Sequence, residues 1–178
     1  LGYRARMELD PQVCYRALRT RDARFDGRFF TAVRTTRIFC RPICPAPTPK
    51  REHCTFVASA AAALAGGYRP CLRCRPEVAP GLPAWRGAAS SVGRALRLIS
   101  EGALDDGDAP ALAARLGVTD RHLRRLFDRH LGASPVAVAQ TRRLLLAKQL
   151  LDDTQLPIAD VAVAAGYTGE RRLREALQ

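Results

Sequence analysis

The sequence predicts two domains of different fold class: a small α+β module, then an all-α domain with two helix-turn-helix motifs. All six cysteines and most of the prolines lie before Pro80, together with β-rich runs and turn signals. After Pro80 the chain has no cysteine and shows helical periodicity built on Ala, Leu and Arg. Within this second part, two similar segments repeat at a spacing of 49 residues, counted from Gly117 to Gly166.

The boundary between the two domains is predicted near Pro80. Residues 80–87, PGLPAWRG, have turn chemistry and no periodicity, which is typical of a linker. We therefore expect residues 1–79 to form the first domain and residues 88–178 the second. The chain begins with Leu1 rather than Met and ends in RRLREALQ, which resembles an unfinished helix, so we expect a longer parent chain.

The first domain is predicted to begin with a helix over residues 10–18. Asp10 is a suitable N-cap, and Pro11 suits the first helical position because its missing N–H would have no partner there. Val13 and Leu18 are expected to face inward.

The middle of the first domain is predicted to contain a hairpin and a short helix. An Asp26-Gly27 turn precedes a β-rich run over residues 29–39, which favours a hairpin or a short sheet. Ser59 is expected to cap a helix over residues 60–65, which ends at Gly66-Gly67. This module has few large apolar residues, and a domain of its size often needs a metal or disulfides for stability.

The second domain is predicted to contain two helix-turn-helix motifs, over residues 112–127 and 161–177. Each has an apolar helix, a glycine, a threonine able to cap the next helix (Thr119 and Thr168) and an arginine-rich helix. Residues 135–151 predict one long amphipathic helix joining them. An ordinary helical bundle is the alternative.

The chain is strongly basic, with a formal net charge of +12 and a sequence pI of about 10.5. Lys50 and Lys148 are its only lysines, so arginine supplies nearly all of the positive charge. The planar guanidinium fork suits phosphate oxygens and guanine edges, which makes nucleic acid the leading partner class. Codon bias toward arginine is an alternative explanation for part of the excess.

Membrane insertion and secretion are both unexpected. The sequence contains no run of about 18 apolar residues, and its first residues, LGYRAR, lack a hydrophobic signal core. We therefore expect a cytoplasmic protein without a membrane partner.

Four of the six cysteines form two closely spaced pairs, CxxxC at Cys40 and Cys44 and CxxC at Cys71 and Cys74, with 26 residues between the pairs. Two such pairs brought together predict a tetrahedral four-thiolate site, the usual geometry of structural zinc. A disulfide framework is the weaker explanation in a chain without a secretory signal.

From spacing alone, a four-cysteine zinc site is more often an inert structural site than a reactive one. Cys14 and Cys54 stand outside the pairs and are interpreted as bystanders, and His53 as incidental rather than as a substitute ligand. The predicted fold class is thus an α+β zinc module followed by an all-α double helix-turn-helix domain.

Two stretches around the cysteine pairs, FCRPIC over residues 39–44 and GYRPCLRC over residues 67–74, resemble the N-terminal zinc module of the Ada family, bacterial response proteins for DNA methylation damage. AVRTT over residues 32–36 and the Asp26-Gly27 turn fit the same resemblance. The second domain is similar to the AraC-type DNA-binding domain that follows this module in those proteins. Together the resemblances cover nearly the whole chain and imply a bacterial, nucleoid-associated protein.

The resemblance implies a single-turnover repair reaction, in which a zinc-bound cysteine irreversibly takes a methyl group from a DNA methylphosphotriester. Alignment on the FCRPxC pattern makes Cys40 the acceptor, and Cys44, Cys71 and Cys74 the remaining Zn²⁺ ligands. The methylated protein is expected to bind DNA more tightly and to activate transcription of repair genes. The implied partners are methylated double-stranded DNA, promoter DNA and RNA polymerase, with the protein acting as a monomer.

A zinc-bound thiolate is a reasonable methyl acceptor on physical grounds. The thiolate is the nucleophilic form of cysteine, and zinc keeps it deprotonated at neutral pH. Four thiolates on Zn²⁺ carry a formal charge of about −2, which falls to about −1 when one becomes a neutral thioether. Repulsion toward neighbouring DNA phosphates then decreases, so we expect methylation to raise the affinity for DNA.

DNA contacts are expected from both domains. Many family members carry glycine at the position of Arg37. If this position needs φ > 0, arginine fits poorly there; if it does not, Arg37 adds a positive charge near Cys40. A buried strand residue is the alternative interpretation of Thr36. The expected contact residues are Thr36, Arg37, Arg41, Arg69 and Arg73 in the module, Arg121, His122, Arg124 and Arg125 in the first motif, and Arg171, Arg172 and Arg174 in the second.

Two alternative functions remain open from the sequence. One is a DNA-binding regulator whose zinc is purely structural. The other is a DNA-targeting arm for a glycosylase, without a promoter of its own.

Overall fold

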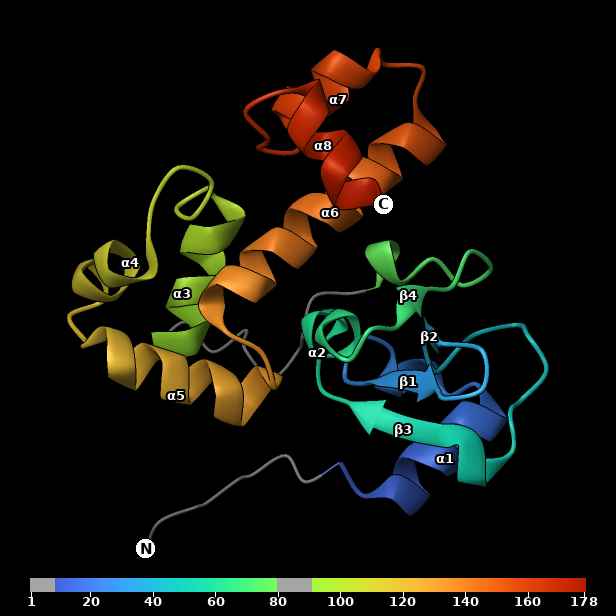
Figure 1. Ribbon diagram of the computed structural model, residues 1–178. Helices are drawn as coiled ribbons and strands as arrows, with labels where there is room; N and C mark the ends of the chain where they lie inside the picture. Colours follow the sequence, from blue (N-terminus) through green and yellow to red (C-terminus); the bar gives the residue numbers. More distant parts are fainter. Residues whose placement is uncertain (1–8, 80–90) are drawn as a thin grey trace, which may run out of the picture. The chain divides into compact units, whose positions relative to one another are not determined.

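The structure is a computed structural model that describes residues 9–79 and 91–178 (Figure 1). The predicted linker, residues 80–87, lies outside the described residues. Contacts within the chain separate it into two compact units, Leu1–Arg86 with Arg125–Ser134, and Gly87–Arg124 with Pro135–Gln178. The predicted fold class is confirmed: a small α+β module precedes an all-α region with two helix-turn-helix motifs.

Helix α1 (Pro11–Thr20) opens the first module, as predicted. The Asp10 carboxylate accepts hydrogen bonds from the backbone N–H groups of Gln12 (2.7 Å) and Val13 (3.4 Å), which satisfies two of the free amides of the first turn.

The inward face of α1 differs from the prediction at one position. Val13 is 42% exposed, so the expectation that it faces inward is wrong, whereas Leu18 is buried as predicted. The helix is rotated so that a face at i, i+3 and i+4 packs against the sheet. That face consists of Cys14, Ala17 and Leu18.

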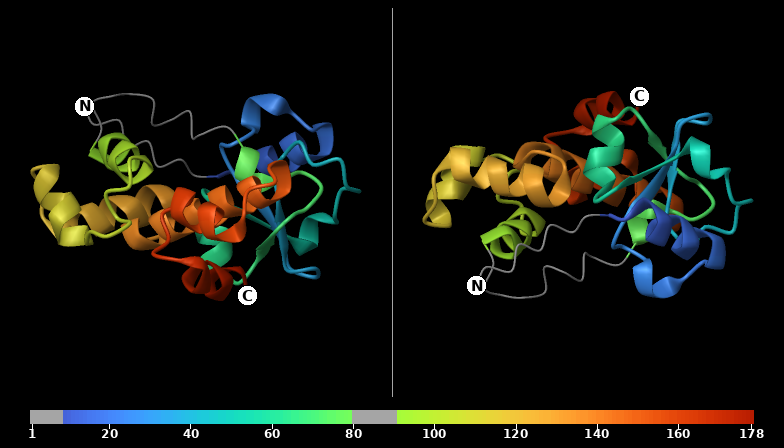
Figure 2. Two further views of the ribbon diagram at one scale, coloured as in Figure 1. Left: turned by 90° about the horizontal axis from the view of Figure 1, so that it is seen from above. Right: turned by 90° about the horizontal axis from the view of Figure 1, so that it is seen from below.

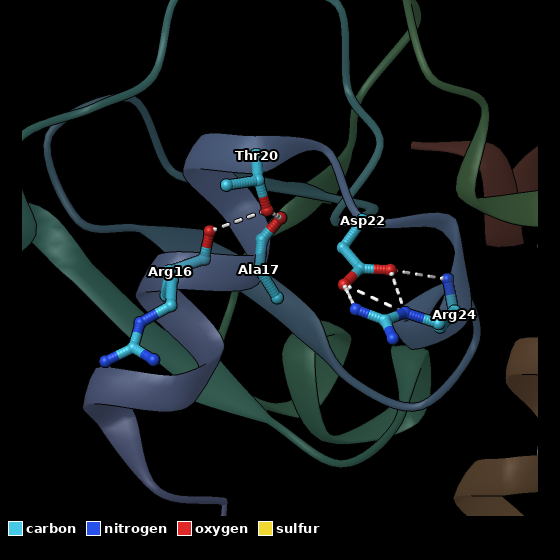
Figure 3. Close-up of polar contacts among 5 residues, drawn as sticks. All are labelled: Arg16, Ala17, Thr20, Asp22 and Arg24. Carbon is cyan, nitrogen blue, oxygen red and sulfur yellow. Dashed lines mark hydrogen bonds and ion pairs between the residues drawn. The ribbon is translucent and has the colours of Figure 1, made fainter.

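The end of α1 is closed by side-chain hydrogen bonds (Figure 3). The Thr20 hydroxyl donates to the carbonyls of Arg16 (3.0 Å) and Ala17 (3.4 Å). Asp22 then accepts from the backbone N–H of Arg24 and pairs with its guanidinium at 2.7 Å. Single 3₁₀ turns complete the part of the module between residues 9 and 79: η1 (Ala23–Phe25), η2 (Arg51–His53) and η3 (Pro76–Val78).

A four-stranded sheet forms the centre of the module, with strand order β3-β1-β2-β4. The predicted hairpin over residues 29–39 is confirmed as two antiparallel strands, and a parallel strand and a further antiparallel strand flank it. The strands are β1 (Phe30–Val33), β2 (Ile38–Cys40), β3 (Cys54–Val57) and β4 (Arg69–Pro70).

Helix α2 (Ala60–Ala65) begins at Ser59, as predicted. The Ser59 hydroxyl accepts a hydrogen bond from the backbone N–H of Ala62 at 3.0 Å. Ala63 of this helix is buried against the sheet, and the chain leaves the helix through Gly66. The small alanine side chains allow the helix to approach the strands closely.

The two faces of the hairpin have different environments because side chains alternate along a strand. Phe30 and Phe39 lie on the α2 face and pack edge to face, with ring centroids 5.7 Å apart. Thr31 and Cys40 occupy directly paired positions on the opposite face. The hairpin register therefore places Cys40 away from the aromatic core, on the face where the cysteines gather.

Arg37 occupies the turn of the hairpin in the left-handed region, with φ = 56°. Its guanidinium donates to the carbonyl of Gly66 at 2.8 Å and lies over the ring of Tyr68, 4.5 Å from the centroid. The position does require φ > 0, so the backbone cost of arginine is offset by contacts at the end of α2.

The described residues of the second region form helices α3 to α8, and the two predicted motifs are confirmed as α4–α5 and α7–α8. The predicted connecting helix is α6, slightly longer than expected (orange in Figure 1, seen from above and below in Figure 2). The helices are α3 (Ser91–Ser100), α4 (Ala109–Arg115), α5 (Asp120–Leu131), α6 (Pro135–Asp153), α7 (Ile158–Ala164) and α8 (Glu170–Leu177). No helix in the described ranges is long and apolar enough to cross a membrane.

The first motif follows the prediction closely. The Thr119 hydroxyl accepts from the backbone N–H of His122 at 3.2 Å and caps α5. Leu123 and Phe127 are fully buried, while Leu126 is only partly buried. The polar side chains of α5 are therefore left on its solvent-facing side.

The second motif differs at its cap. We expect Thr168 to cap α8, but the helix begins one residue later, with Gly169 as an N-cap that offers no side-chain hydrogen bond. The turn, measured from Gly166 to the buried Leu173, is one residue longer than its counterpart in the first motif. This extra residue displaces the threonine from the cap position.

Arg143 of α6 joins two loops of the second region. Its guanidinium donates to the carbonyls of Asp105 and Gly166, both at 3.3 Å, and lies over the ring of Tyr167 at 5.5 Å. Gly166 has φ = 82°, and a Cβ atom there would lie 2.5 Å from the Asp105 carboxylate, so any other residue would be strained and would force that carboxylate to move. The loop before the first motif and the turn of the second are thus held by one side chain.

The left-handed conformation of Arg37 leads to a stability prediction. Arg37→Ala and Arg37→Gly both remove the guanidinium contacts, but only glycine removes the steric cost of φ > 0. We expect Arg37→Gly to be more stable than Arg37→Ala by about 1 kcal/mol. Hydrogen exchange of the β1–β2 amides in the metal-loaded full chain measures the difference, and equal protection in the two variants would contradict it.

Candidate metal centre

Four cysteine side chains meet beside the β2–β4 edge of the sheet. The Sγ atoms of Cys40, Cys44, Cys71 and Cys74 all lie within 4.8 Å of one another. Cys40 ends β2, and Cys71 follows β4 directly. Parallel pairing of these strands, extended by a hydrogen bond from the Cys71 N–H to the Phe39 carbonyl (3.0 Å), brings the two pairs together.

The spacing of the sulfurs fits a tetrahedral zinc ion. With Zn–S bonds of about 2.3 Å, neighbouring sulfurs of a tetrahedral site lie about 3.8 Å apart. The Sγ atoms of Cys44 and Cys71 are 3.9 Å apart. The four thiols therefore need little movement to hold the ion.

The protonation of the cluster also favours a divalent cation. The Cys44 sulfur accepts hydrogen bonds from the Cys40 and Cys74 thiols, which lowers the pKa of Cys44 to about 2. Donating to Cys44 and Cys74, together with burial, raises the pKa of Cys40. Thiols this close cannot all ionise without a counter-charge, and a metal ion replaces the protons they share.

Backbone donors surround the cluster unevenly. The Arg41 N–H donates to the Cys74 sulfur at 3.3 Å, and the Ala46 N–H donates to the Cys44 sulfur. Within residues 9–79, no backbone N–H is directed at the Cys40 sulfur. Hydrogen bonds to a thiolate stabilise its charge and make it less nucleophilic, so the Cys40 sulfur is more reactive than those of Cys44 and Cys74.

Exposure also distinguishes Cys40 from its neighbours. Cys44, Cys71 and Cys74 are at most 7% exposed, whereas Cys40 is only half-buried. A cavity of about 360 Å³ reaches the cluster, and the exposed residues Thr36, Arg69 and Arg73 line its edge. Thr36 is a turn residue rather than a buried strand residue.

The Arg41 side chain is mostly buried and bonds other groups of the module. Its side chain is 12% exposed and forms an ion pair with Asp26, itself 5% exposed, with Nε 2.9 Å from Oδ1. The same guanidinium donates to the Cys74 carbonyl at 3.1 Å. These bonds hold the metal-binding loop, and the DNA contact expected of Arg41 stays a prediction. Arg37 is similarly committed to Gly66.

The remaining cysteines and His53 lie outside the cluster. Burial raises the pKa of the Cys14 thiol to about 11 and raises that of Cys54, so both stay protonated and unreactive. His53 lies beside Glu52, with Nε2 3.5 Å from Oε1. The structure thus separates these residues from the four that approach one another.

The residues predicted to contact DNA from the helical region are mostly on the surface of α5 and α8. Arg121 is exposed, and Arg124 is exposed but pairs with Asp120 at 2.8 Å. His122 is partly buried and Arg125 exposed. On α8 the exposed arginines pair with acidic side chains of the same helix: Arg171 and Arg172 with Glu175, and Arg174 with Glu170.

Sequence reasoning missed two residues near the centre. The sequence predicted only a turn at Asp26. Its ion pair with Arg41 joins positions 15 residues apart, and no local pattern in the sequence indicates that pair. Thr31 had no visible signal, since only the strand register shows that it faces Cys40.

Two family models match the chain. One, described as the metal binding domain of Ada, covers residues 13–77, and the other, described as a helix-turn-helix domain, covers residues 112–178. The first match covers all four clustered cysteines. Zinc is thus the metal that this domain binds.

Known relatives match nearly the whole length of this chain. A probable bifunctional transcriptional activator/DNA repair enzyme AlkA of Mycobacterium tuberculosis (strain CDC 1551 / Oshkosh) is 44% identical over 97% of this chain and 35% of the relative. A bifunctional transcriptional activator/DNA repair enzyme AdaA of Bacillus subtilis (strain 168) is 30% identical over 85% of this chain and 70% of the relative. The chain therefore spans about a third of the first relative and most of the second.

A solved structure, the DNA methyl phosphotriester repair domain of E. coli Ada, is 48% identical over 38% of this chain and 74% of that chain. Its TM-score of 0.36 is too low to add to the description of the fold.

The four-thiol cluster leads to a prediction about metal content. The full chain is expected to bind one zinc ion, and Cys71→Ser to weaken binding by more than about 100-fold, since changes beyond the ligands alone cost 10- to 100-fold. Cys54→Ser is the matched control and should keep full zinc content. Elemental analysis and titration with a chromophoric chelator measure both, and equal zinc loss in the two variants would contradict the assignment.

Proposed function

Since the chain belongs to the Ada family of transcriptional activator and DNA repair proteins, we propose that it repairs DNA methylphosphotriesters by methylating its own Cys40. The reaction is a single-turnover S-methyl transfer from a methylated DNA phosphate to the protein. The methylated protein then activates transcription of repair genes.

The asymmetry of the cysteine cluster carries this proposal. Among the four cysteines only Cys40 is half-buried rather than buried; it also lines the cavity, and unlike Cys44 and Cys74 it has no backbone donor on its sulfur. An inert structural site has no need of such an opening, because burial of all four sulfurs protects the metal from competing ligands. Cys44, Cys71 and Cys74 are the three remaining ligands.

Zinc, when bound, keeps the cysteines in the thiolate form at neutral pH. In the reaction, the Cys40 sulfur attacks the methyl carbon of the neutral phosphotriester. The S–C bond forms while the C–O bond breaks, and the bonding electron pair stays on the phosphate oxygen. The thiolate becomes a neutral thioether, and the DNA regains a charged phosphodiester, so total charge is conserved.

Residues at the cavity edge are suited to position the DNA backbone. Thr36, Arg69 and Arg73 are exposed, and no ion pair engages either arginine within the described ranges. Their donors can hold the phosphates on either side of the methylated one. When Cys40 loses its charge, the zinc centre repels the neighbouring DNA phosphates less. The same arginines then bind the DNA backbone more tightly.

The helical region supplies recognition of a promoter in this proposal. Helix α5 presents exposed Arg121 and Arg125 beside its capped N-terminus, a geometry suited to the major groove. Helix α8 is a second candidate with its three exposed arginines. We further propose that residues 1–79 and 88–178 are the functional domains, and that the protein acts as a monomer and recruits RNA polymerase.

The competing proposal is a DNA-binding regulator or glycosylase-targeting arm whose zinc is purely structural. The low exposure of three of the four cysteines favours a structural contribution from the metal. The two proposals differ in whether Cys40 gains a methyl group.

Methyl transfer is tested by intact mass analysis of the zinc-loaded full chain after incubation with duplex DNA that carries methylphosphotriesters. We expect a gain of one CH₂ unit, mapped to Cys40 by peptide sequencing, with at most one transfer per chain. Cys40→His, which keeps a ligand of a type that zinc accepts, should bind zinc without gaining mass. Cys14→Ser is the matched control and should gain it normally. No gain in the wild-type chain would favour the structural-zinc proposal.

The charge change predicts a difference in DNA affinity. The methylated protein should bind a short duplex about 2- to 10-fold more tightly than the unmethylated protein, and the ratio should decrease as salt increases. The double variant Arg69→Met/Arg73→Met should lose most of the difference, whereas Arg16→Met, on the exposed side of α1, should keep it. Fluorescence anisotropy measures each Kd, and identical affinities of the two forms would disprove the electrostatic account.

A further inference from the structure

Thr31 carries a buried hydroxyl that the fold does not use. Its side chain is 0% exposed, and its Oγ1 atom has no hydrogen-bond partner among the described residues. A buried hydroxyl without a partner costs roughly 1–3 kcal/mol relative to a paired one. Valine has nearly the same shape and avoids this cost, so the hydroxyl indicates a partner that forms only in the assembled site.

The position of Thr31 points to the Cys40 sulfur as that partner. Thr31 on β1 pairs directly with Cys40 on β2, so both side chains lie on the same face of the hairpin. The Cβ atoms of directly opposed residues lie about 4.5–5.5 Å apart, which is within reach of an O–H···S hydrogen bond. Both residues line the same cavity.

The other sulfurs are less suitable acceptors, because Cys40 is the cysteine of the cluster that pairs directly with Thr31 in the sheet. The Cys74 sulfur already accepts the Arg41 N–H, and the Cys44 sulfur accepts the Ala46 N–H. Cys40 has no such donor within residues 9–79, although its thiolate carries the same charge when the centre is assembled. The Cys40 sulfur has no backbone donor, and the Thr31 hydroxyl has no acceptor. These two groups therefore lie opposite each other on the paired strands β1 and β2.

We propose that Thr31 is a positioning residue that donates its hydroxyl proton to the Cys40 thiolate once the metal centre is assembled. The inference rests on the zinc centre and on Cys40 as the acceptor in the proposed function. The hydrogen bond occupies one lone pair of the sulfur and leaves another for the methyl carbon. It also moderates the nucleophilicity of a sulfur that no backbone amide restrains.

Cobalt substitution of the full chain tests this hydrogen bond without relying on methyl transfer. Thiolate-to-cobalt charge-transfer bands move to lower energy when a hydrogen bond to the sulfur is lost. Thr31→Val should shift the band to lower energy, and Thr31→Ser, which keeps the hydroxyl, should restore the wild-type position. Thr55→Val, an exposed threonine of the neighbouring strand, should leave the band unchanged.

Zinc affinity and methyl-transfer rate give two further readouts. Thr31→Val should weaken zinc binding and accelerate methylation of Cys40, each by about 2- to 10-fold, the range expected for one hydrogen bond of ordinary net strength. An unchanged cobalt band in Thr31→Val, or tighter zinc binding, overturns the inference. If Thr31→Val does not fold, a shifted band in Thr31→Ser overturns it as well. A chain that shows the band shift but no methyl transfer refutes the proposed function and leaves the hydrogen bond standing.

Discussion

Parallel pairing of two very short strands is the constraint on which the module depends. Strand β4 has only two residues, yet its alignment with β2 sets Cys71 beside Cys40 and closes the cluster of four sulfurs. The two apolar clusters, around Phe39 and Phe29, are small for a domain of this size. A metal ion shared by the two cysteine pairs therefore does part of the work that a larger hydrophobic core does elsewhere. In the proposed function the same sulfurs stabilise the fold and offer a nucleophile, so their environments must differ, and burial and backbone donors provide a difference.

Arginine has two distinct uses in this chain, although composition alone suggests one. Several guanidinium groups lie at surfaces suited to phosphates, as at Arg69 and Arg73. Others end on backbone carbonyls or a buried carboxylate: Arg37 on Gly66, Arg41 on Asp26 and Cys74, Arg143 on Asp105 and Gly166. A planar cation with five donors can join segments that are distant in sequence, which a lysine cannot do as well. High arginine content is thus partly a property of the fold and only partly a sign of nucleic acid.

Local signals in the sequence predicted most of the architecture. Asp10, Ser59 and Thr119 act as N-caps as expected, because capping depends on a few neighbouring atoms. The cysteine spacing predicted the two close pairs, and the preference of zinc for four ligands predicted that the pairs would meet. Features that depend on long-range register were missed: strands β3 and β4, the Asp26–Arg41 pair, and Thr31 opposite Cys40. Two local predictions were wrong, since tertiary packing chose the inward face of α1 and left Val13 exposed, and an added turn residue moved Thr168 away from the cap.

The side chain of Arg143 has a consequence for the spacing of the two helix-turn-helix motifs on DNA. It ties the loop ahead of the first motif to the turn inside the second, and Asp105 leaves no room for any side chain at Gly166. If both motifs read DNA, as proposed, two elements linked in this way cannot move independently along a duplex. Adding one base pair between their contact points would rotate the second point around the helix axis, out of phase with a rigid reader. The protein would then fix the number of base pairs between the two contact points. Base substitutions between these points would weaken binding less than insertions.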